Sequence, residues 1–409
     1  HEDDGDVMSV FWNKNDTTRQ LLFGSAFVEI PAGGGSGTNN VNSSSNVIFD
    51  VNNDIDCLGD MVLKLVYTNK TGATLNDLSG NAVDNQRLIT LINRVEIQVG
   101  TQIWQTFENN DLLSLVATEL SSGSYADLSF QTSGGVCEQL FSNGALDGQL
   151  VDDAVATAFI PLKVFTKTLG PRLENFAEQT EGGYLMGAAP HQQVKVKVFT
   201  DTLDDGSSGS DVSTIALSLY AKNQVMCNEE REQMKAMPAG LPKRLKMTQN
   251  AHVTDIGTSI IKTIDLDHFS LYGSHLIISG NAGTDTDGNP IRIKTAELKL
   301  NSSSFSGQLP GILLDSCTSD SLGIYANKFI HADGSNFTVD EYGVGTYVFP
   351  LSASAFSGSA VPLNRFDSIR LTLTFTSTPQ NGGSTFISVT CVGETTALFK
   401  GGAASLAMY

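Results

Sequence analysis

The sequence predicts an all-β protein built from two similar β-sandwiches. Apolar and polar residues alternate over short segments rich in Val, Ile, Leu, Thr and Phe, and this period of two is that of a strand with one buried face. Polar loops rich in Gly, Ser, Asn and Asp separate the segments. The same series of segments occurs twice in the 409 residues, a length that suits two large β-domains.

The first half of the chain contains clear alternating segments. In VKVKVFT (194–200) the Val residues lie on one face of the predicted strand, and Lys195 and Lys197 lie on the other. Such one-sided patterns are typical of antiparallel sheets packed as sandwiches, not of parallel sheets buried on both faces. We expect strands in this half at 45–51, 60–68, 93–100, 158–166, 193–200 and 214–221.

The second half repeats this behaviour. In SIRLTLTF (368–375) the Leu residues alternate with Arg370, Thr372 and Thr374. We expect strands at 274–280, 291–300, 346–352, 368–375 and 385–392. Some polar loops exceed the length of simple hairpins and are expected on the surface: 32–45, 201–211 and 280–289.

Helical patterns are few and short. Residues 109–120 have Asp111 as an N-terminal cap and apolar residues on one face. Residues 228–237 begin with acidic residues and end before Pro238. The prolines and basic residues that follow lead us to predict 228–246 as the connector between the two domains.

The two halves match each other segment by segment. Glu96 and Glu297 occupy the same place in their strands, and Pro161 and Pro350 each lie inside an apolar strand. Because proline cannot donate a hydrogen bond to an interior ladder, we expect both proline strands at a sheet edge or a bulge. The matched segments follow in the same order: 93–100 with 294–301, 158–165 with 346–353, and 194–200 with 368–375.

Composition excludes several classes of partner. The chain has 25 Lys+Arg against 44 Asp+Glu, a net charge of −19. Binding to nucleic-acid phosphates or to anionic lipid requires dense Lys and Arg, so we predict no direct nucleic-acid partner. No apolar segment approaches the ~20 residues of a membrane helix. The basic cluster of Lys243, Arg244 and Lys246 is expected to be a solvated connector or an intersubunit contact.

Residue types that carry catalysis or bind metals form no recognised pattern. The His residues lack metal-ligand spacing, and no nucleophile elbow occurs. Asp285, Asp287 and Asn289 resemble the start of a calcium loop, but Ala296 stands where the closing Glu is required, so we predict a turn. An alternating segment leaves weak cation binding open: Asp50, Asn52, Asp54 and Asp56. We predict no catalytic residue, no cofactor and no metal site.

The cysteines are scattered and never form a C-x-x-C pair, which argues against a disulfide framework and a zinc site. Small buried thiols are the expected state of all five: Cys57, Cys137, Cys227, Cys317 and Cys391. Sequons for N-glycosylation matter only for a secreted protein, and occur at Asn15, Asn42, Asn69, Asn301 and Asn336.

Several segments, in order, resemble those of the double jelly-roll major capsid proteins of large eukaryotic DNA viruses, especially algal viruses, and their polinton-like relatives. The clearest are VEIQVGTQ (95–102), FIPLKVF (159–165) and PHQQVKVKV (190–198). The chain departs from the family where an Asp-Trp is expected after the VEIQVG turn, since Trp104 lies earlier. Other matching segments are NDIDCLGDMVLKLVYT (53–68), EEREQMKAMPAGLP (229–242), AELKLNSSSF (296–305), NRFDSIRLTLTF (364–375) and KGGAASLAMY (400–409).

The resemblance implies two consecutive eight-stranded jelly-roll β-sandwiches with short helices in the connections. It implies a homotrimer that forms a pseudo-hexagonal capsomer, contacts neighbouring capsomers and minor capsid or penton proteins, and tiles an icosahedral shell. The protein would be assembled in the host cell and reside in the virion. An internal membrane is left open and is not indicated by the residues. The expected domains are an arm (1–19), the first jelly roll (20–227), the connector (228–246), the second jelly roll (247–399) and a tail (400–409).

Two other classes of function remain as alternatives. The Gly-, Ser- and Asn-rich loops would also suit a secreted carbohydrate-binding or adhesin protein made of two sandwiches. That function requires exposed aromatic platforms, and the sequence has only Trp12 and Trp104 as tryptophans. A β-sandwich hydrolase is the third class, although no catalytic constellation points to it.

Overall fold

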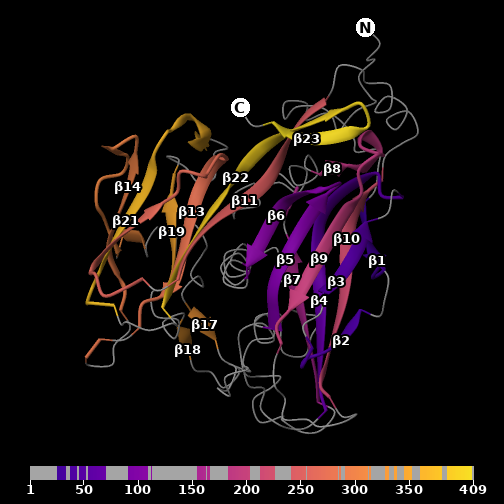
Figure 1. Cartoon of the computed structure of the whole chain (residues 1–409), viewed down its shortest axis with the longest axis horizontal. Coiled ribbons are helices and arrows are strands. Elements are labelled where there is room, and N and C mark those ends of the chain that lie inside the picture. Colours follow the sequence, from indigo (N-terminus) through magenta and orange to yellow (C-terminus); the bar gives the residue numbers. More distant parts are fainter. Residues whose placement is uncertain are drawn as a thin grey trace.

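The computed structural model of the chain is almost entirely antiparallel β-structure (Figure 1). The residues that it describes are 25–33, 37–43, 46–51, 54–70, 91–108, 112, 154–162, 164–165, 183–202, 212–225, 241–254, 256–283, 285–286, 291–311, 313–314, 328–330, 336–338, 345–351, 360–379 and 385–407.

The first half forms two sheets that pack face to face (Figure 1). One sheet has the order β1-β10-β4-β7 and the other β3-β9-β5-β6; the short strands β2 and β8 pair with β10 and β4. The strands are β1 (Ser25–Ile30), β2 (Thr38–Asn40), β3 (Asn46–Val51), β4 (Cys57–Asn69), β5 (Ile92–Val99), β6 (Gln102–Glu108), β7 (Ala154–Leu162), β8 (Tyr184–Leu185), β9 (Val194–Thr200) and β10 (Thr214–Gln224).

The second half repeats this arrangement with the orders β11-β22-β13-β19 and β12-β21-β14-β15. Three-residue 3₁₀ helices follow β8 and β20 (Met186–Ala188 and Leu363–Arg365). The strands are β11 (Leu241–Thr254), β12 (Ile261–Asp265), β13 (Tyr272–Asn281), β14 (Ile293–Leu300), β15 (Ser303–Ser304), β16 (Leu309–Pro310), β17 (Lys328–Ile330), β18 (Asn336–Thr338), β19 (Gly345–Pro350), β20 (Val361–Pro362), β21 (Ile369–Phe375), β22 (Phe386–Lys400) and β23 (Ala403–Ala407).

Each half is therefore a jelly roll, with eight strands in two four-stranded rows whose neighbours are mostly distant in sequence. The predicted all-β fold class and the predicted internal repeat are both confirmed. The segments that matched in the sequence are equivalent strands in the structure: β5 with β14, β7 with β19, and β9 with β21. The remaining equivalent pairs are β1 with β11, β3 with β12, β4 with β13, β6 with β15, and β10 with β22.

The two strands that contain Pro161 and Pro350 lie at sheet edges, as predicted. β7, which contains Pro161, and β19, which ends at Pro350, are each the last strand of their sheet. Among the described strands, each pairs on one side only, β7 with β4 and β19 with β13. An outer position spares proline the hydrogen bond that it cannot donate.

The alternating segments bury one face as predicted. In β9 the residues Val194, Val196 and Val198 are fully buried, while Lys195 and Lys197 are half-exposed. In β21 the residues at 369, 371, 373 and 375 are buried in the same way. The buried faces of both sheets in each jelly roll meet in an apolar core, and this burial is the main stabilising term of a sandwich.

The structure places strands in two segments that we expected outside the jelly rolls. Residues 241–246, which we expected in the connector, form the start of β11, a strand that pairs with β22 along all 14 residues. Pro242 is tolerated there because β11 is an outer strand. Residues 403–407 of the expected tail form β23, which pairs with β22. Of the expected helix at 109–120 only Leu112 is described, and it is helical; residues 228–237 lie outside the described residues.

We expect Leu371→Ala to lower the free energy of unfolding by about 2–4 kcal/mol, because it leaves a cavity in the core of the second jelly roll. Urea denaturation followed by circular dichroism measures this change. Thr374→Ala, on the outward face of the same strand, is the matched control and should change stability by less than about 0.5 kcal/mol. Equal effects of the two variants would contradict the assignment of faces.

Candidate functional site

The two jelly rolls meet where β6 of the first lies beside β11 of the second (Figure 1). β11 is an outer strand, and every second residue of such a strand directs its backbone N–H and C=O away from the sheet. A row of unpaired backbone groups attracts strands of other chains. The pairing of these groups therefore decides whether this edge is closed.

Gln105 of β6 closes the centre of the edge. Its side-chain oxygen Oε1 accepts a hydrogen bond from the backbone N–H of Thr248 at 2.9 Å, and its Nε2 donates to the backbone carbonyl of Thr248 at 2.9 Å. The same Nε2 also donates to the Thr248 hydroxyl. Both residues are buried. One side-chain amide thus supplies the donor and the acceptor that a neighbouring strand would supply.

The positions on either side of Thr248 are paired as well. The backbone N–H of Phe165 donates to the carbonyl of Lys246 at 3.1 Å. The Asn250 side chain donates to the carbonyl of Thr106 at 3.0 Å, and the Asn250 carbonyl contacts Nε2 of His268 at 3.0 Å. The outward carbonyls at three successive positions of β11 therefore have partners, and the first jelly roll supplies those at Lys246 and Thr248.

An aromatic cluster lies behind these hydrogen bonds. Trp104 contacts Phe165 and Tyr184 edge-on, with ring centroids 6.2 and 5.6 Å apart. Tyr184 contacts Phe399 of β22 at 5.1 Å, so the cluster includes both jelly rolls. Burial raises the pKa of the Tyr184 phenol above its ordinary value, because the charged form loses its hydration.

A second tie joins the C-terminal hairpin to the first jelly roll. The backbone N–H of His191 donates to the carbonyl of Gly402 at 3.1 Å, and the N–H of Ala404 donates to Oε1 of Gln192 at 2.6 Å. Gly402 has a φ of 77°, and a Cβ there would lie 2.4 Å from the ring of His191. Glycine is required at this position for both reasons, and the hairpin that it allows reaches across the junction.

The candidate residues noted in the sequence do not converge. Among the described residues there is no group of three or more His, Cys, Asp or Glu that could hold a metal ion. His275 contacts the Ser274 hydroxyl at 2.9 Å, and Asp50 pairs with Lys195 at 3.4 Å. Of the calcium-like loop only Asp285 is described among its oxygen ligands.

One residue of the basic cluster, which we expected to be a solvated connector or an intersubunit contact, is buried within the chain. Lys246 is only 6% exposed, because β11 is covered by the first jelly roll at this point; the side chains of Lys243 and Arg244 lie outside the described ones. Cys57 and Cys391 are buried thiols, as predicted, and burial raises the pKa of the Cys391 thiol. Cys137, Cys227 and Cys317 lie outside the part of the chain that the structure describes.

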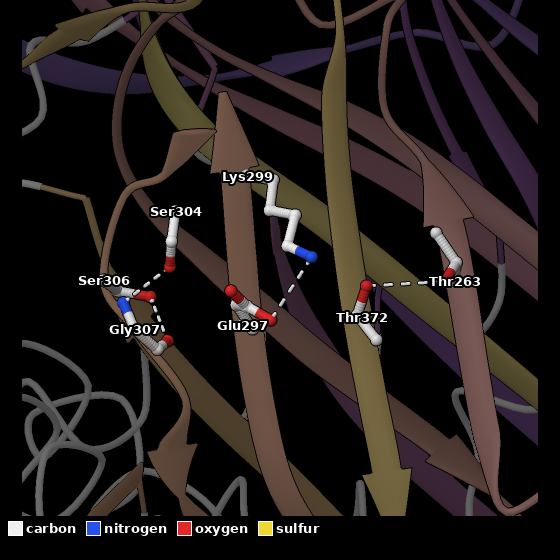
Figure 2. Close-up of polar contacts among 7 residues, drawn as sticks. All are labelled: Thr263, Glu297, Lys299, Ser304, Ser306, Gly307 and Thr372. Carbon is white, nitrogen blue, oxygen red and sulfur yellow. Dashed lines mark hydrogen bonds and ion pairs between the residues drawn. The ribbon is translucent and has the colours of Figure 1, made fainter. Parts of the chain in front are cut away.

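The outward face of β12, β21 and β14 is polar (Figure 2). The hydroxyls of Thr263 and Thr372, on the neighbouring strands β12 and β21, form a hydrogen bond at 3.4 Å. Lys299 and Glu297 form an ion pair at 3.6 Å. In the first jelly roll the equivalent Glu96 pairs with Arg94 at 3.1 Å. Such partly exposed ion pairs contribute little to stability, but they leave these faces with charges of both signs.

Apolar side chains are exposed at a few places on both jelly rolls. Phe27 of the outer strand β1 is 59% exposed, and Phe305, which follows β15, is 43% exposed. Other exposed apolar residues are Val28, Ile103, Val155, Val225, Ile260, Ile261 and Leu313. Among the described residues no helix is long and apolar enough to cross a membrane.

No protein-family model and no curated protein matches this sequence. Solved structures do match. The PBCV-1 virus capsid matches with a TM-score of 0.63 and 14% identity over 97% of this chain and 99% of the other. The Faustovirus major capsid protein matches with a TM-score of 0.57 and 9% identity over 95% and 92%, and the STIV major capsid protein with 0.53 and 10% over 91% and 96%.

These matches cover both jelly rolls of this chain and nearly the whole of the other chains. The class that the architecture defines is therefore the double jelly roll, the fold of viral major capsid proteins. The resemblance noted in the sequence is confirmed at the level of the fold.

We expect Gln105→Ala to destabilise the junction by about 1–3 kcal/mol, because the N–H and C=O of Thr248 lose their partners while remaining covered. Gln102→Ala, at an exposed position of the same strand, is the control and should have little effect. Urea denaturation of both variants checks the difference. A Gln105→Ala protein as stable as the control would mean that water replaces the amide.

Tyr184 should make stability depend on pH in the alkaline range. Because its pKa is raised in the folded state, the folded protein keeps a proton that the unfolded chain releases, so its contribution is present below about pH 10 and is lost above it. We expect Tyr184→Phe to lose less stability than the wild type between about pH 9 and 11. Urea denaturation midpoints of the two proteins that fall equally as the pH rises would contradict this.

Proposed function

We propose that this chain is the major capsid protein of a DNA virus and resides in the shell of the virion. The observation that carries the proposal is the double jelly roll itself, which aligns from end to end with the PBCV-1 capsid and the Faustovirus major capsid protein. Two jelly rolls in one chain, closed against each other, form a building block with two similar halves.

The proposed unit of assembly is a homotrimer. Three chains with two jelly rolls each would give six similar bodies around one axis, a pseudo-hexagonal capsomer that tiles an icosahedral shell. Such capsomers would contact one another and minor capsid or penton proteins. Weak contacts suffice there, because many act together. The polar faces with charges of both signs, as in Figure 2, suit wet contacts between neighbours.

The proposed role is structural and not catalytic. The described His, Asp and Glu residues are spread over separate strands and loops, and those of the junction hold its backbone groups rather than line a site. The net charge of −19 is consistent with a shell that does not bind its genome directly. The capsid neighbours do not favour the alternative, a secreted carbohydrate-binding or adhesin protein.

Purified protein should form a trimer of about 131 kDa, three times the chain mass of 43.6 kDa. Light scattering over a range of concentrations measures the mass, and negative-stain electron microscopy should show particles of hexagonal outline. A protein that stays monomeric at every concentration would contradict the proposal. A monomer that also binds defined glycans on an array would favour the carbohydrate-binding alternative.

A further inference from the structure

The junction between the jelly rolls uses one surface of each half, and in the part of the chain that the structure describes the equivalent surfaces of the repeat are exposed. Within the chain, β6 of the first jelly roll covers the edge of β11 in the second. By strand order, β15 of the second jelly roll is equivalent to β6, and β1 of the first is equivalent to β11. The chain therefore carries a second pair of surfaces built like the first.

Strand register fixes the equivalence of the edges residue by residue. In the first jelly roll, a row of paired residues crosses the sheet from the proline strand to the edge: Pro161, Val62, Tyr220 and Glu29. In the second, the matching row runs through Pro350, His275, Val392 and Thr248. Glu29 thus occupies in β1 the place that Thr248, the partner of Gln105, occupies in β11.

The two edges differ in what covers them. Residues 245–248 of β11 are all buried, whereas residues 26–29 of β1 are all exposed. Phe27 is 59% exposed and Val28 is 39% exposed, on opposite faces of the strand. An outer strand with exposed apolar side chains is a site for pairing with another polypeptide. β1 is thus equivalent to the junction edge of β11, but its described side chains at 26–29 are exposed where those of β11 are buried.

The turn after β14 has the matching feature. Lys299 is paired with Ser304 in the second jelly roll, and the equivalent Gln98 is paired with Ile103 in the first. Phe305, the residue after Ser304, is therefore equivalent to Trp104, the residue after Ile103. Trp104 is 7% exposed inside the junction, but Phe305 is 43% exposed. Local hydrogen bonds hold the turn: Phe305 N–H to the Leu298 carbonyl at 2.8 Å, and Gly307 N–H to the Ser304 hydroxyl at 3.0 Å (Figure 2).

β1 and β14 lie at opposite ends of the molecule, so one chain cannot bring these surfaces together (Figure 1). We propose that the turn 303–307 of one copy docks on β1 of a second copy and repeats the internal junction, with Phe305 in the role of Trp104. Such a contact is head-to-tail, and it forms a closed ring when the rotation between copies closes. This inference rests on the proposed trimer and names its contact residues.

The contact between copies should be weaker than the internal junction. Ser306 follows Phe305 where Gln105 follows Trp104, and a serine hydroxyl is too short to bond both backbone groups of a facing strand. In the free chain the Ser306 hydroxyl donates to the carbonyl of Gly307 instead. Apolar burial of Phe305, Phe27 and Val28 therefore has to provide most of the affinity, and reversible association follows.

Cross-linking tests the contact directly. Full-length chains carrying Glu29→Cys and Ser306→Cys together should be joined by a short bismaleimide into covalent dimers and trimers on denaturing electrophoresis. The matched control pairs Ser306→Cys with Val155→Cys, an exposed position on β7 at the opposite edge of the same sheet, and should give no ladder. The same treatment of wild-type protein shows how much cross-linking occurs through the native cysteines.

A second variant tests the anchor. Phe305→Ser should weaken trimer formation at least about tenfold by sedimentation or light scattering, the loss expected when a buried aromatic anchor is truncated. Ile261→Ser, an exposed apolar residue of the same jelly roll, should leave it unchanged.

Trimers that form normally without the cross-link and despite Phe305→Ser would overturn the inference, because another segment would then cover β1, while the proposed function would stand. Wild-type protein that never leaves the monomer would overturn both.

Discussion

The closed edge of β11 is the constraint on which the arrangement of this molecule depends. A long outer strand directs a row of backbone donors and acceptors away from its sheet, and each group left covered but unpaired costs about 1–3 kcal/mol. Gln105 closes this row at Thr248, Phe165 pairs with the carbonyl of Lys246, and His268 of the second jelly roll contacts the carbonyl of Asn250, so the bonds from Gln105 and Phe165 join the two halves. Hydrogen bonds of this kind are directional, so they fix where the first jelly roll lies against the second.

The aromatic cluster adds buried apolar area to the junction, whose geometry the hydrogen bonds determine. Trp104, Phe165 and Tyr184 come from three separate segments of the first jelly roll, and Phe399 comes from the second. The hairpin at Gly402 ties the same region from the other side. Because one half supplies β6 and the other supplies an edge, the two halves of a repeated fold differ in surface. That difference leaves β1 and the Phe305 turn available to a neighbour.

Alternation and repetition were sufficient to predict much of the fold. The Val residues of 194–200 and the Leu residues of 368–375 face the core as expected, and both proline strands are outermost. Four outer strands were not among the expected ones: β1, β6, β11 and β12. The start of β11 was assigned to the connector, because Pro242 and three basic residues are typical of a linker; an outer strand tolerates them. Lys246 was expected in solvent for the same reason and is covered by the first jelly roll.

The sequence by itself determined that there are two sandwiches, where their strongly alternating strands lie and which faces those strands bury, because these properties follow from a period of two over a few neighbouring residues. Only the tertiary structure decided which edge is closed and which is open. Gln105 and Thr248 are 143 residues apart and belong to no local pattern. A glutamine on a polar strand and a threonine on a basic one acquire a joint role only when two folded bodies meet.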